Sequence, residues 1–127
     1  MLPLKVLVAD DHAEFRHIIH EYLDRLPNIS VVGEATDGQE VVEQVERLQP
    51  DVVLMDISMP RQSGLEATRI IKQRWPETKV VIATMHDNPL YRLQASEARA
   101  DDFVVKSSLK AKLVATLDSY ARALAVS

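Results

Sequence analysis

The regular alternation of short apolar segments with longer amphipathic segments constrains the fold of this chain more than any other feature of its sequence. The apolar segments have the length and β-branched content of strands buried on both faces. They are Lys5–Ala9, Val31–Ala35, a run within Asp51–Pro60, Lys79–Ala83 and Phe103–Val105. A helical pattern follows each one, and this order predicts a parallel sheet with right-handed crossovers and helices on both faces.

The amphipathic segments repeat apolar residues at helical spacing and carry helix-start signals. Asp37 and Glu40 resemble a capping box, and Ser63-Gly64 opens the third predicted helix. The apolar positions are Phe15, Ile18, Ile19, Tyr22, Leu23 and Leu26, then Val41, Val42, Val45 and Leu48, then Leu65, Thr68, Ile71 and Trp75, and finally Leu109, Leu113, Leu117, Tyr120 and Leu124. The segment Asn88–Ala98 is predicted to be a weaker helix, because its apolar residues bury little area on any one face.

Composition excludes several classes of function. The 127 residues suffice for one domain, and a formal net charge of -4 argues against a nucleic-acid surface on this chain. Cysteine is absent, which rules out disulfides and thiol chemistry. The sequence shows neither a signal peptide nor an apolar run that could span a membrane. We therefore predict a soluble, cytoplasmic domain.

Polar residues stand where four of the predicted strands end. Asp10 and Asp11 follow the first strand, Asp56 the third, Thr84 the fourth and Lys106 the fifth. In a parallel sheet these ends share one edge, and the functional crevice of such folds lies beyond it. Each residue alone has an ordinary interpretation, such as a helix cap, but independent caps need not gather at one edge.

The chemistry of these side chains favours a metal ion and a phosphoryl group. Two carboxylates within about 5 Å of each other repel by roughly 3 kcal/mol at an effective dielectric near 20, so the acidic groups need a cation. Oxygen ligands without cysteine or convergent histidine favour Mg²⁺. Asp56 could then attack phosphorus as a nucleophile, with Lys106 and Thr84 donating to phosphoryl oxygens. His17 and His20 lack a third convergent ligand, so we predict that both are solvated.

Almost the whole chain resembles the receiver domain of two-component response regulators. The segments Leu7-Val-Ala-Asp-Asp-His12, Val52-Val-Leu-Met-Asp-Ile-Ser-Met-Pro60 and Ala83-Thr-Met-His-Asp-Asn-Pro89 resemble the NarL/FixJ subfamily, whose output domains are of the LuxR type. The resemblance implies a flavodoxin-like sheet of order 2-1-3-4-5 with five helices. It also implies a phosphoryl donor, either a partner histidine kinase or a small phosphodonor.

The same resemblance assigns roles to individual residues. It implies that Asp56 is the phosphoacceptor, that Asp10, Asp11, Asp56 and the backbone carbonyl of Ser58 hold Mg²⁺, and that Lys106 contacts the phosphate. Thr84 and Phe103 would form the switch pair. Ser58 and His86 lie where the family tunes phosphoryl lifetime, so changing either should alter autodephosphorylation.

The chain departs from the subfamily pattern late in the sequence. Ala98-Arg-Ala-Asp-Asp-Phe103 stands where the subfamily has Ala-Gly-Ala-x-Gly-Tyr, so Arg99 and Asp102 replace two glycines. A positive φ at Arg99 would cost roughly 1 kcal/mol relative to glycine. Asp101 and Asp102 add negative charge there, Phe103 lacks the hydroxyl of the usual tyrosine, and Ser107 stands where many members have proline. These changes leave the acidic site intact but alter the output surface, which the resemblance places at the fourth helix, fifth strand and fifth helix.

Other functions fit the sequence less well than a phosphorylated switch. A flavin-binding domain would need a loop after the first strand that binds the phosphate of the cofactor. The carboxylates of Asp10 and Asp11 would repel this phosphate. An aspartate-nucleophile phosphatase would usually have a second acid at the position of Ser58. We therefore expect no enzyme acting on a third-party substrate. A stand-alone or phosphorylation-independent receiver that serves as an interaction module stays an alternative.

Residues 1–127 are predicted to form the receiver alone, without an output domain. The sequence does not separate a stand-alone receiver from one cut at the linker. Family members usually regulate transcription through a DNA-binding domain, and many dimerise through the fourth helix, fifth strand and fifth helix. A homodimer on phosphorylation is thus a possible assembly, with no nucleic-acid contact by this domain and no membrane contact.

Overall fold

The computed structural model describes residues 3–59, 62–85 and 87–126, and its five parallel strands form one sheet. The strands are β1 (Leu4–Ala9), β2 (Ile29–Ala35), β3 (Val52–Met55), β4 (Lys79–Thr84) and β5 (Asp102–Val105), in the order β2-β1-β3-β4-β5. The helices are α1 (Ala13–Asp24), α2 (Gly38–Leu48), α3 (Gly64–Arg74), α4 (Pro89–Glu97) and α5 (Leu109–Val126), with a short 3₁₀ turn at Lys106–Ser108. The predicted fold class, strand order and helix count are confirmed.

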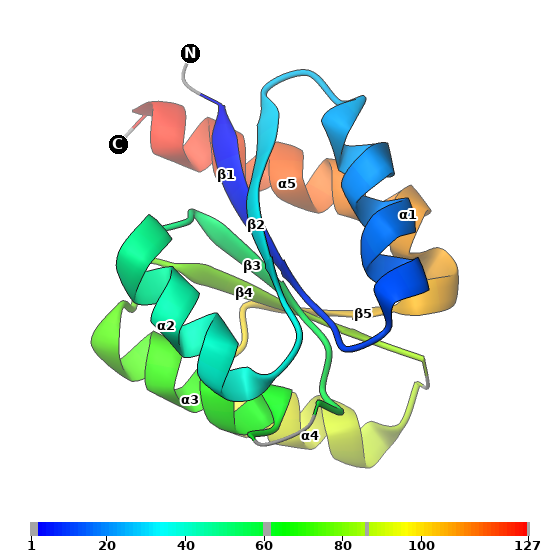
Figure 1. Cartoon of the computed structure of the whole chain (residues 1–127), viewed down its shortest axis with the longest axis vertical. Helices are drawn as coiled ribbons and strands as arrows, with labels where there is room; N and C mark the ends of the chain where they lie inside the picture. The colour runs from blue at the N-terminus through cyan, green and yellow to red at the C-terminus, as the bar shows by residue number, and fades with distance from the viewer. Residues whose placement is uncertain (1–2, 60–61, 86, 127) are drawn as a thin grey trace.

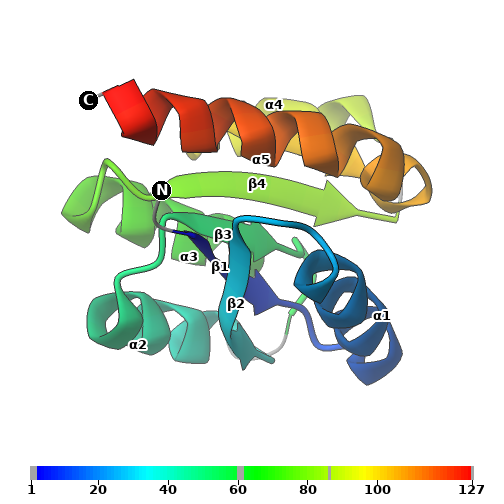
Figure 2. The same ribbon diagram turned by 90° about the horizontal axis from the view of Figure 1, so that it is seen from above.

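The helices form two layers on the sheet. The core clusters place α1 and α5 against one face and α2, α3 and α4 against the other, as Figure 1 shows, and Figure 2 shows α1 and α2 on opposite sides of β2. Successive side chains of β1 pack alternately against the two helix layers. Val6 and Val8 pack with Ile19 of α1 and Leu113 of α5, whereas Leu7 packs into the cluster of α2 and α3. The sheet therefore has a hydrophobic core on each face, and the strands read as continuous apolar runs because both of their faces are buried.

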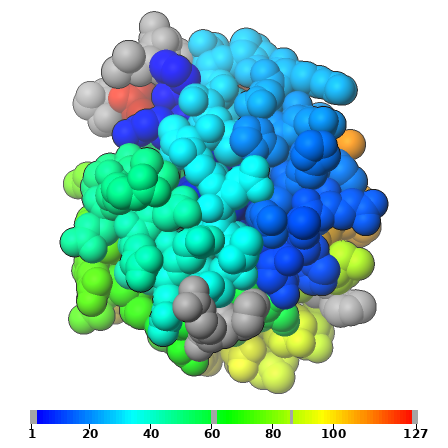
Figure 3. Space-filling view, viewed as in Figure 1, coloured from blue at the N-terminus to red at the C-terminus, as the bar shows by residue number. Residues whose placement is uncertain are grey.

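The two outer strands are less covered than the three inner ones. Six of the seven residues of β2 are only partly buried, whereas all four of β3 are buried. In the space-filling view β2 reaches the surface between α1 and α2 (Figure 3). The well-buried part of the sheet is therefore its centre, where β1 and β3 lie side by side, and this pairing brings Ala9 opposite Met55. The residues that follow these two strands leave the sheet at the same edge.

Helix capping agrees with the sequence prediction in most details. The Asp37 carboxylate accepts from the backbone N–H of Glu40 at 2.9 Å, and the Glu40 carboxylate accepts from the N–H of Thr36 at 2.7 Å. This arrangement resembles a capping box, except that the Glu40 carboxylate accepts from Thr36, the residue before the N-cap, instead of from the N-cap itself. Ser63 caps α3 and Asn88 caps α4.

Leu124, one of the predicted apolar positions of α5, is exposed.

The acidic segment after α4 differs from the prediction. Asp101 was expected to add negative charge near the output surface, but its carboxylate accepts from the buried Lys72 ammonium at 2.9 Å and from the N–H of Val80 at 2.8 Å. Lys72 also donates to the carbonyls of Pro76 and Thr78. The Asp101 charge is therefore compensated within the fold, where it joins α3 to the start of β4. Breaking such a pair leaves an unpaired buried charge, which is strongly destabilising.

The turn after α4 has the strained backbone that the missing glycine predicted. Arg99 adopts a φ of 70°, and its N–H bonds to the carbonyl of Ser96 at 3.0 Å. A side chain in this left-handed region is disfavoured relative to glycine.

We therefore expect Arg99→Gly to raise the free energy of unfolding by about 1 kcal/mol, because glycine adopts positive φ without a steric penalty. Urea denaturation of the two proteins measures the difference. Arg99→Ala is the matched control, since it removes the guanidinium but keeps the Cβ atom and should give no such gain. Equal stabilisation by both variants would show that the side chain, not the backbone, is responsible.

Candidate functional site: an acidic cluster at the edge of the sheet

The site is built where β1 and β3 end. Asp10 follows β1, and its N–H bonds to the carbonyl of Ala35 at 2.9 Å; the N–H of Asp56, which follows β3, bonds to the carbonyl of Ala9 at 2.9 Å. These backbone bonds extend the sheet ladder by one residue on each strand. They hold both aspartates in place, and both are buried, Asp10 to 1% exposure. Asp11, the next residue, is exposed.

Gly64 allows the segment after Asp56 to fold close to the start of α3. Its N–H bonds to the carbonyl of Ile57 at 2.9 Å, and a Cβ atom at this position would lie 1.8 Å from the carbonyl oxygen of Asp56. That distance is far inside van der Waals contact, so only glycine fits here. The Ser63-Gly64 pair thus serves both as a helix start and as a support for the backbone of Asp56.

The acidic side chains converge as the sequence predicted. One carboxylate oxygen from each of Asp10, Asp11 and Asp56 and one ring nitrogen of His12 all lie within 4.8 Å of one another. Three carboxylates in so small a space repel strongly, and oxygen donors of this kind are the preferred ligands of hard divalent cations. The residues present therefore fit a magnesium ion. Ser58 is exposed two residues after Asp56, and its carbonyl stays a predicted ligand.

Lys106 reaches the cluster from the end of β5. Its ammonium lies 2.5 Å from Asp10 Oδ2 and 3.8 Å from Asp56 Oδ1, and it is buried over the ring of Phe15 at 4.1 Å from the centroid. The aromatic face favours the cation, and the ring shields it from water. The predicted proximity of Lys106 to both acids is thus present, and Phe15, predicted only as an apolar helix residue, helps to hold it.

Of the other predicted residues, Thr84 lies at the expected edge of the sheet, whereas Phe103 lies near the start of β5. Thr84 is buried at the end of β4, and Phe103 on β5 is partly buried against the core. Phe103 pairs with Ile82, two positions before Thr84 on the neighbouring strand. The guanidinium of Arg92 stands over the Phe103 ring at 4.6 Å from its centroid. His86 and Pro60 lie outside the described residues.

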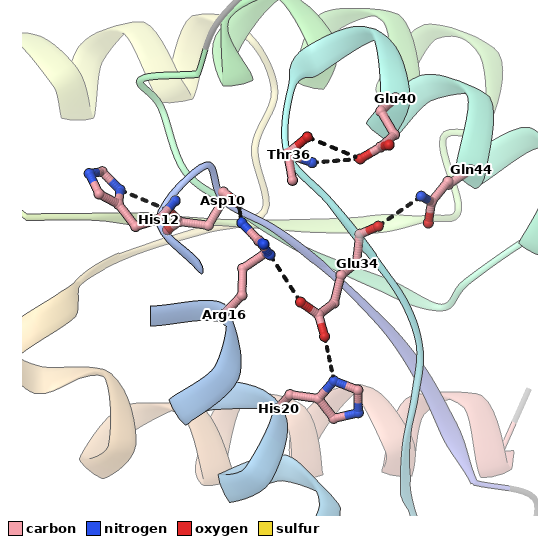
Figure 4. A network of polar contacts seen from close by, with 8 residues as sticks. All are labelled: Asp10, His12, Arg16, His20, Glu34, Thr36, Glu40 and Gln44. Atoms are coloured by element: carbon pink, nitrogen blue, oxygen red, sulfur yellow. Dashed lines mark hydrogen bonds and ion pairs between the residues drawn. The ribbon is translucent and has the colours of Figure 1, made fainter. Parts of the chain in front are cut away.

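A second polar network, not predicted from the sequence, supports the backbone of Asp10. Arg16 donates to the carbonyl of Asp10 at 2.7 Å and to the carboxylate of Glu34 at 3.0 Å, and His20 lies 2.7 Å from the same carboxylate. Figure 4 shows this chain of contacts running from α1 across β2 to Gln44 of α2. His20 was predicted to be solvated, but its side chain is only 34% exposed and is paired. The prediction failed because Glu34 lies on β2, and the contact between β2 and α1 depends on how the folded chain packs.

Electrostatics single out Asp56 within the cluster. Burial, followed by the charges of Asp10 and Asp11, raises its pKa to about 6, although Lys106 partly offsets the effect. The pKa of Glu34 is lowered, chiefly by its bond to His20. Asp56 is therefore the carboxylate whose charge is least compensated by protein groups, and a cation or a covalent partner would stabilise it most.

Comparisons with known proteins agree with this geometry. A family model described as the response regulator receiver domain matches residues 6–118. The chain belongs to the response regulator receiver domain family. The predicted resemblance is confirmed. Receiver domains bind Mg²⁺ at an acidic pocket, and Asp10, Asp11 and Asp56 form an acidic cluster in this chain.

Individual relatives include both regulators and an enzyme. The chain is 38% identical over 103 residues to the transcriptional regulatory protein DegU of Brevibacillus brevis, covering 81% of this chain and 44% of DegU. It is 40% identical over 106 residues to a protein-glutamate methylesterase/protein-glutamine glutaminase of Alkalilimnicola ehrlichii, covering 83% and 27% of the two chains. The chain thus spans less than half the length of these two relatives.

The fold of a solved receiver matches over nearly its full length. The signal receiver domain of the putative response regulator NarL from Mycobacterium tuberculosis superimposes with a TM-score of 0.88 at 32% identity, covering 94% of this chain and 98% of that one. No helix in the described part of the chain is long and apolar enough to cross a membrane.

The electrostatics of Asp56 predict how stability depends on pH. A carboxyl group whose pKa is higher in the folded than in the unfolded protein binds more protons when folded, so its ionisation weakens the fold as pH rises from about 4 to 6. We expect Asp56→Asn to be more stable than the parent at pH 7 by up to about 2 kcal/mol, after allowing for solvent screening, and to lose that advantage near pH 4.

Urea denaturation in the presence of a chelator, at both pH values, measures this effect. Asp118→Asn changes an exposed carboxylate on α5 and serves as the control, with little expected change at either pH. An advantage of Asp56→Asn that is the same at both pH values would contradict the assignment, because it could not arise from ionisation.

Proposed function

We propose that Asp56 is the phosphoacceptor of this receiver domain and that a partner histidine kinase, or a small phosphodonor, supplies the phosphoryl group. The observation that carries the proposal is the position of Lys106, 3.8 Å from Asp56 Oδ1, within a cluster that also contains the carboxylates of Asp10 and Asp11. A nucleophilic carboxylate, a point charge for phosphoryl oxygens and ligands for a divalent ion are the parts that phosphoryl transfer requires.

In the proposed reaction a carboxylate oxygen of Asp56 attacks phosphorus. The new O–P bond forms as the P–N bond to the donor imidazole breaks, and the imidazole keeps the bonding electron pair and takes up a proton. Asp10, Asp11, Asp56 and the carbonyl of Ser58 would hold Mg²⁺, which supplies charge neutralisation when bound. Lys106 stabilises the charge on the phosphoryl oxygens, and the Thr84 hydroxyl donates to another of these oxygens.

Phosphorylation would act as a switch through the strand ends. Thr84 would move toward the phosphoryl group, and Phe103 would repack beside it, changing the surface of α4, β5 and α5. In the longer protein we propose that this change regulates transcription, since relatives such as DegU are named as transcriptional regulators. Dimerisation on phosphorylation is part of the proposal, as is the absence of a third-party substrate for residues 1–127.

The proposal predicts covalent modification at one residue. Incubation with Mg²⁺ and acetyl phosphate should add the mass of one phosphoryl group, in an acid-labile form, to the parent chain and to Asp118→Asn. Asp56→Asn should show no gain, because an amide is not a nucleophile for this reaction. Labelling that persists in Asp56→Asn would refute the assignment. An unlabelled parent that fails to bind Mg²⁺ would favour the phosphorylation-independent interaction module.

The lifetime of the modification should depend on residue 58. Ser58 is exposed beside the acceptor, so a bulkier apolar side chain there would restrict the attacking water. We expect Ser58→Leu to slow the decay of the phosphorylated form severalfold, measured by mass spectrometry after removal of the donor, and a substitution at His86 to alter the rate as well. Ser127→Leu, far away in sequence, provides a control. Unchanged decay in both variants would contradict the prediction.

A further inference from the structure

The Lys106 ammonium is buried between two carboxylates and an aromatic ring. Its side chain is 5% exposed, and its one hydrogen bond among the described residues goes to Asp10 Oδ2. Asp56 Oδ1, at 3.8 Å, is close enough for ion pairing but too far for a hydrogen bond. An ammonium has three N–H donors, so two of them have no hydrogen-bond acceptor in the part of the chain that the structure describes.

The third neighbour of this ammonium is the face of the Phe15 ring, whose centroid lies 4.1 Å from Lys106 Nζ. Phe15 stands in the first turn of α1, which lies beside the segment that joins β5 to α5 (Figure 1). The ring is partly buried and packs against the core cluster on this side of the sheet, so contacts other than the ammonium also fix its position. The negative face of an aromatic ring attracts a cation, most strongly where water is excluded.

The ring and the Asp10 carboxylate hold the ammonium in different ways. A hydrogen bond to Asp10 requires a particular distance and direction, whereas attraction to a ring face requires no particular donor angle. In the proposed function Asp10 is also a metal ligand, so its carboxylate cannot give its full charge to Lys106 at the same time. The ring face is then the contact that keeps the ammonium beside Asp56 while the ammonium exchanges a carboxylate oxygen for a phosphoryl oxygen.

We propose that Phe15 is a positioning residue for phosphoryl transfer, and that the face of its ring holds the Lys106 ammonium where it meets the phosphoryl group on Asp56. The inference rests on the proposed function and adds to it a residue that acts only through Lys106. The apolar pattern of α1 assigned Phe15 to the hydrophobic core alone.

A purely structural role for Phe15 predicts a different result. If the ring only fills space and excludes water, any apolar ring of the same size serves equally well. If its negative face holds the cation, a less negative face lets the ammonium leave for water in a larger fraction of molecules, and the transfer rate falls with the competent fraction. Fluorine substitution separates the two roles, because it withdraws electrons from the ring face and adds little volume.

The experiment replaces Phe15 by mono-, di- and trifluorophenylalanine and measures the rate at which Mg²⁺ and acetyl phosphate label Asp56. We expect the logarithm of this rate to fall steadily with the number of fluorine atoms, and to reach a rate about three- to tenfold below that of the parent for the trifluoro ring. Calorimetry should show that the affinity for beryllofluoride, which mimics the phosphoryl group, falls in the same order. The affinity for Mg²⁺ alone should stay within about twofold, because the metal ligands are unchanged.

Fluorotryptophan in place of Trp75 is the matched control. Trp75 is the only tryptophan of the chain, and its ring centroid lies 6.0 Å from Cζ of Arg74, at the end of α3 opposite to Gly64. The replacement alters a cation–ring contact away from the acidic cluster, so the labelling rate should not change. Natural residues repeat the comparison. Phe15→Leu keeps an apolar side chain without a ring face and should label slowly, whereas Phe15→Tyr keeps the ring and should label at close to the parent rate.

The failure of this inference can be told apart from the failure of the proposed function. Equal labelling rates across the fluorinated series, or a Phe15→Leu variant as fast as the parent, would overturn the role of Phe15 and leave Asp56 as the phosphoacceptor. Equal slowing by the replacement at Trp75 would also overturn it, because the effect would not depend on Lys106. A parent chain that is never labelled refutes the proposed function, and this inference with it.

Discussion

Mutual repulsion among the carboxylates of Asp10, Asp11 and Asp56 is the constraint on which the rest of the site depends. The ladder bonds of β1 and β3 fix the backbones of Asp10 and Asp56, so these acids cannot relieve the repulsion by moving apart. The fold therefore brings cationic groups to them. Lys106 reaches Asp10 from β5, and the burial of its ammonium against Phe15 strengthens the attraction by excluding water. The compensation is incomplete, since the pKa of Asp56 stays raised. A further cation at this position would therefore stabilise the ionised carboxylate.

The two-faced core is what allows so polar a cluster to be held rigidly. Each central strand contributes side chains to both hydrophobic layers, so β1 and β3 cannot shift along each other without exposing apolar residues on two faces. Their ends are consequently well-defined positions for Asp10 and Asp56. The contacts with the edge strand β2 are polar. Arg16 ties the carbonyl of Asp10 to Glu34 of β2, and this edge strand is itself only partly buried. The polar network therefore supports Asp10 on the side of β2, where the residues of the sheet are only partly buried.

Much of the fold and most of the candidate site could be predicted from the sequence, because both depend on local patterns. Strand ends are visible as a change from apolar to polar residues, and parallel topology then places Asp10, Asp56, Thr84 and Lys106 at one edge. The positive φ of Arg99 was predictable for the same reason, since it follows from the end of a helix. Contacts that depend on the register between distant elements were not predictable. The Lys72–Asp101 pair and the bond between His20 and Glu34 join segments whose alignment no local pattern reveals. The same limitation applied to the charge of Asp101, which is compensated by a lysine of α3.

Contacts of Asp102 and Arg92 link β5 and α4 to their neighbours. Asp102 accepts a hydrogen bond from the Tyr120 hydroxyl of α5, and burial first, then this bond, raise the pKa of that tyrosine. Arg92 of α4 bridges Asp87, at 2.6 Å, and the ring of Phe103. Ala95 is the only residue of α4 that is fully buried, so these polar and aromatic contacts hold much of its position. Exposed contacts of this kind contribute little to stability, because water and salt screen them. Little of α4 is therefore held in place by hydrophobic burial, and its position depends largely on these exposed contacts.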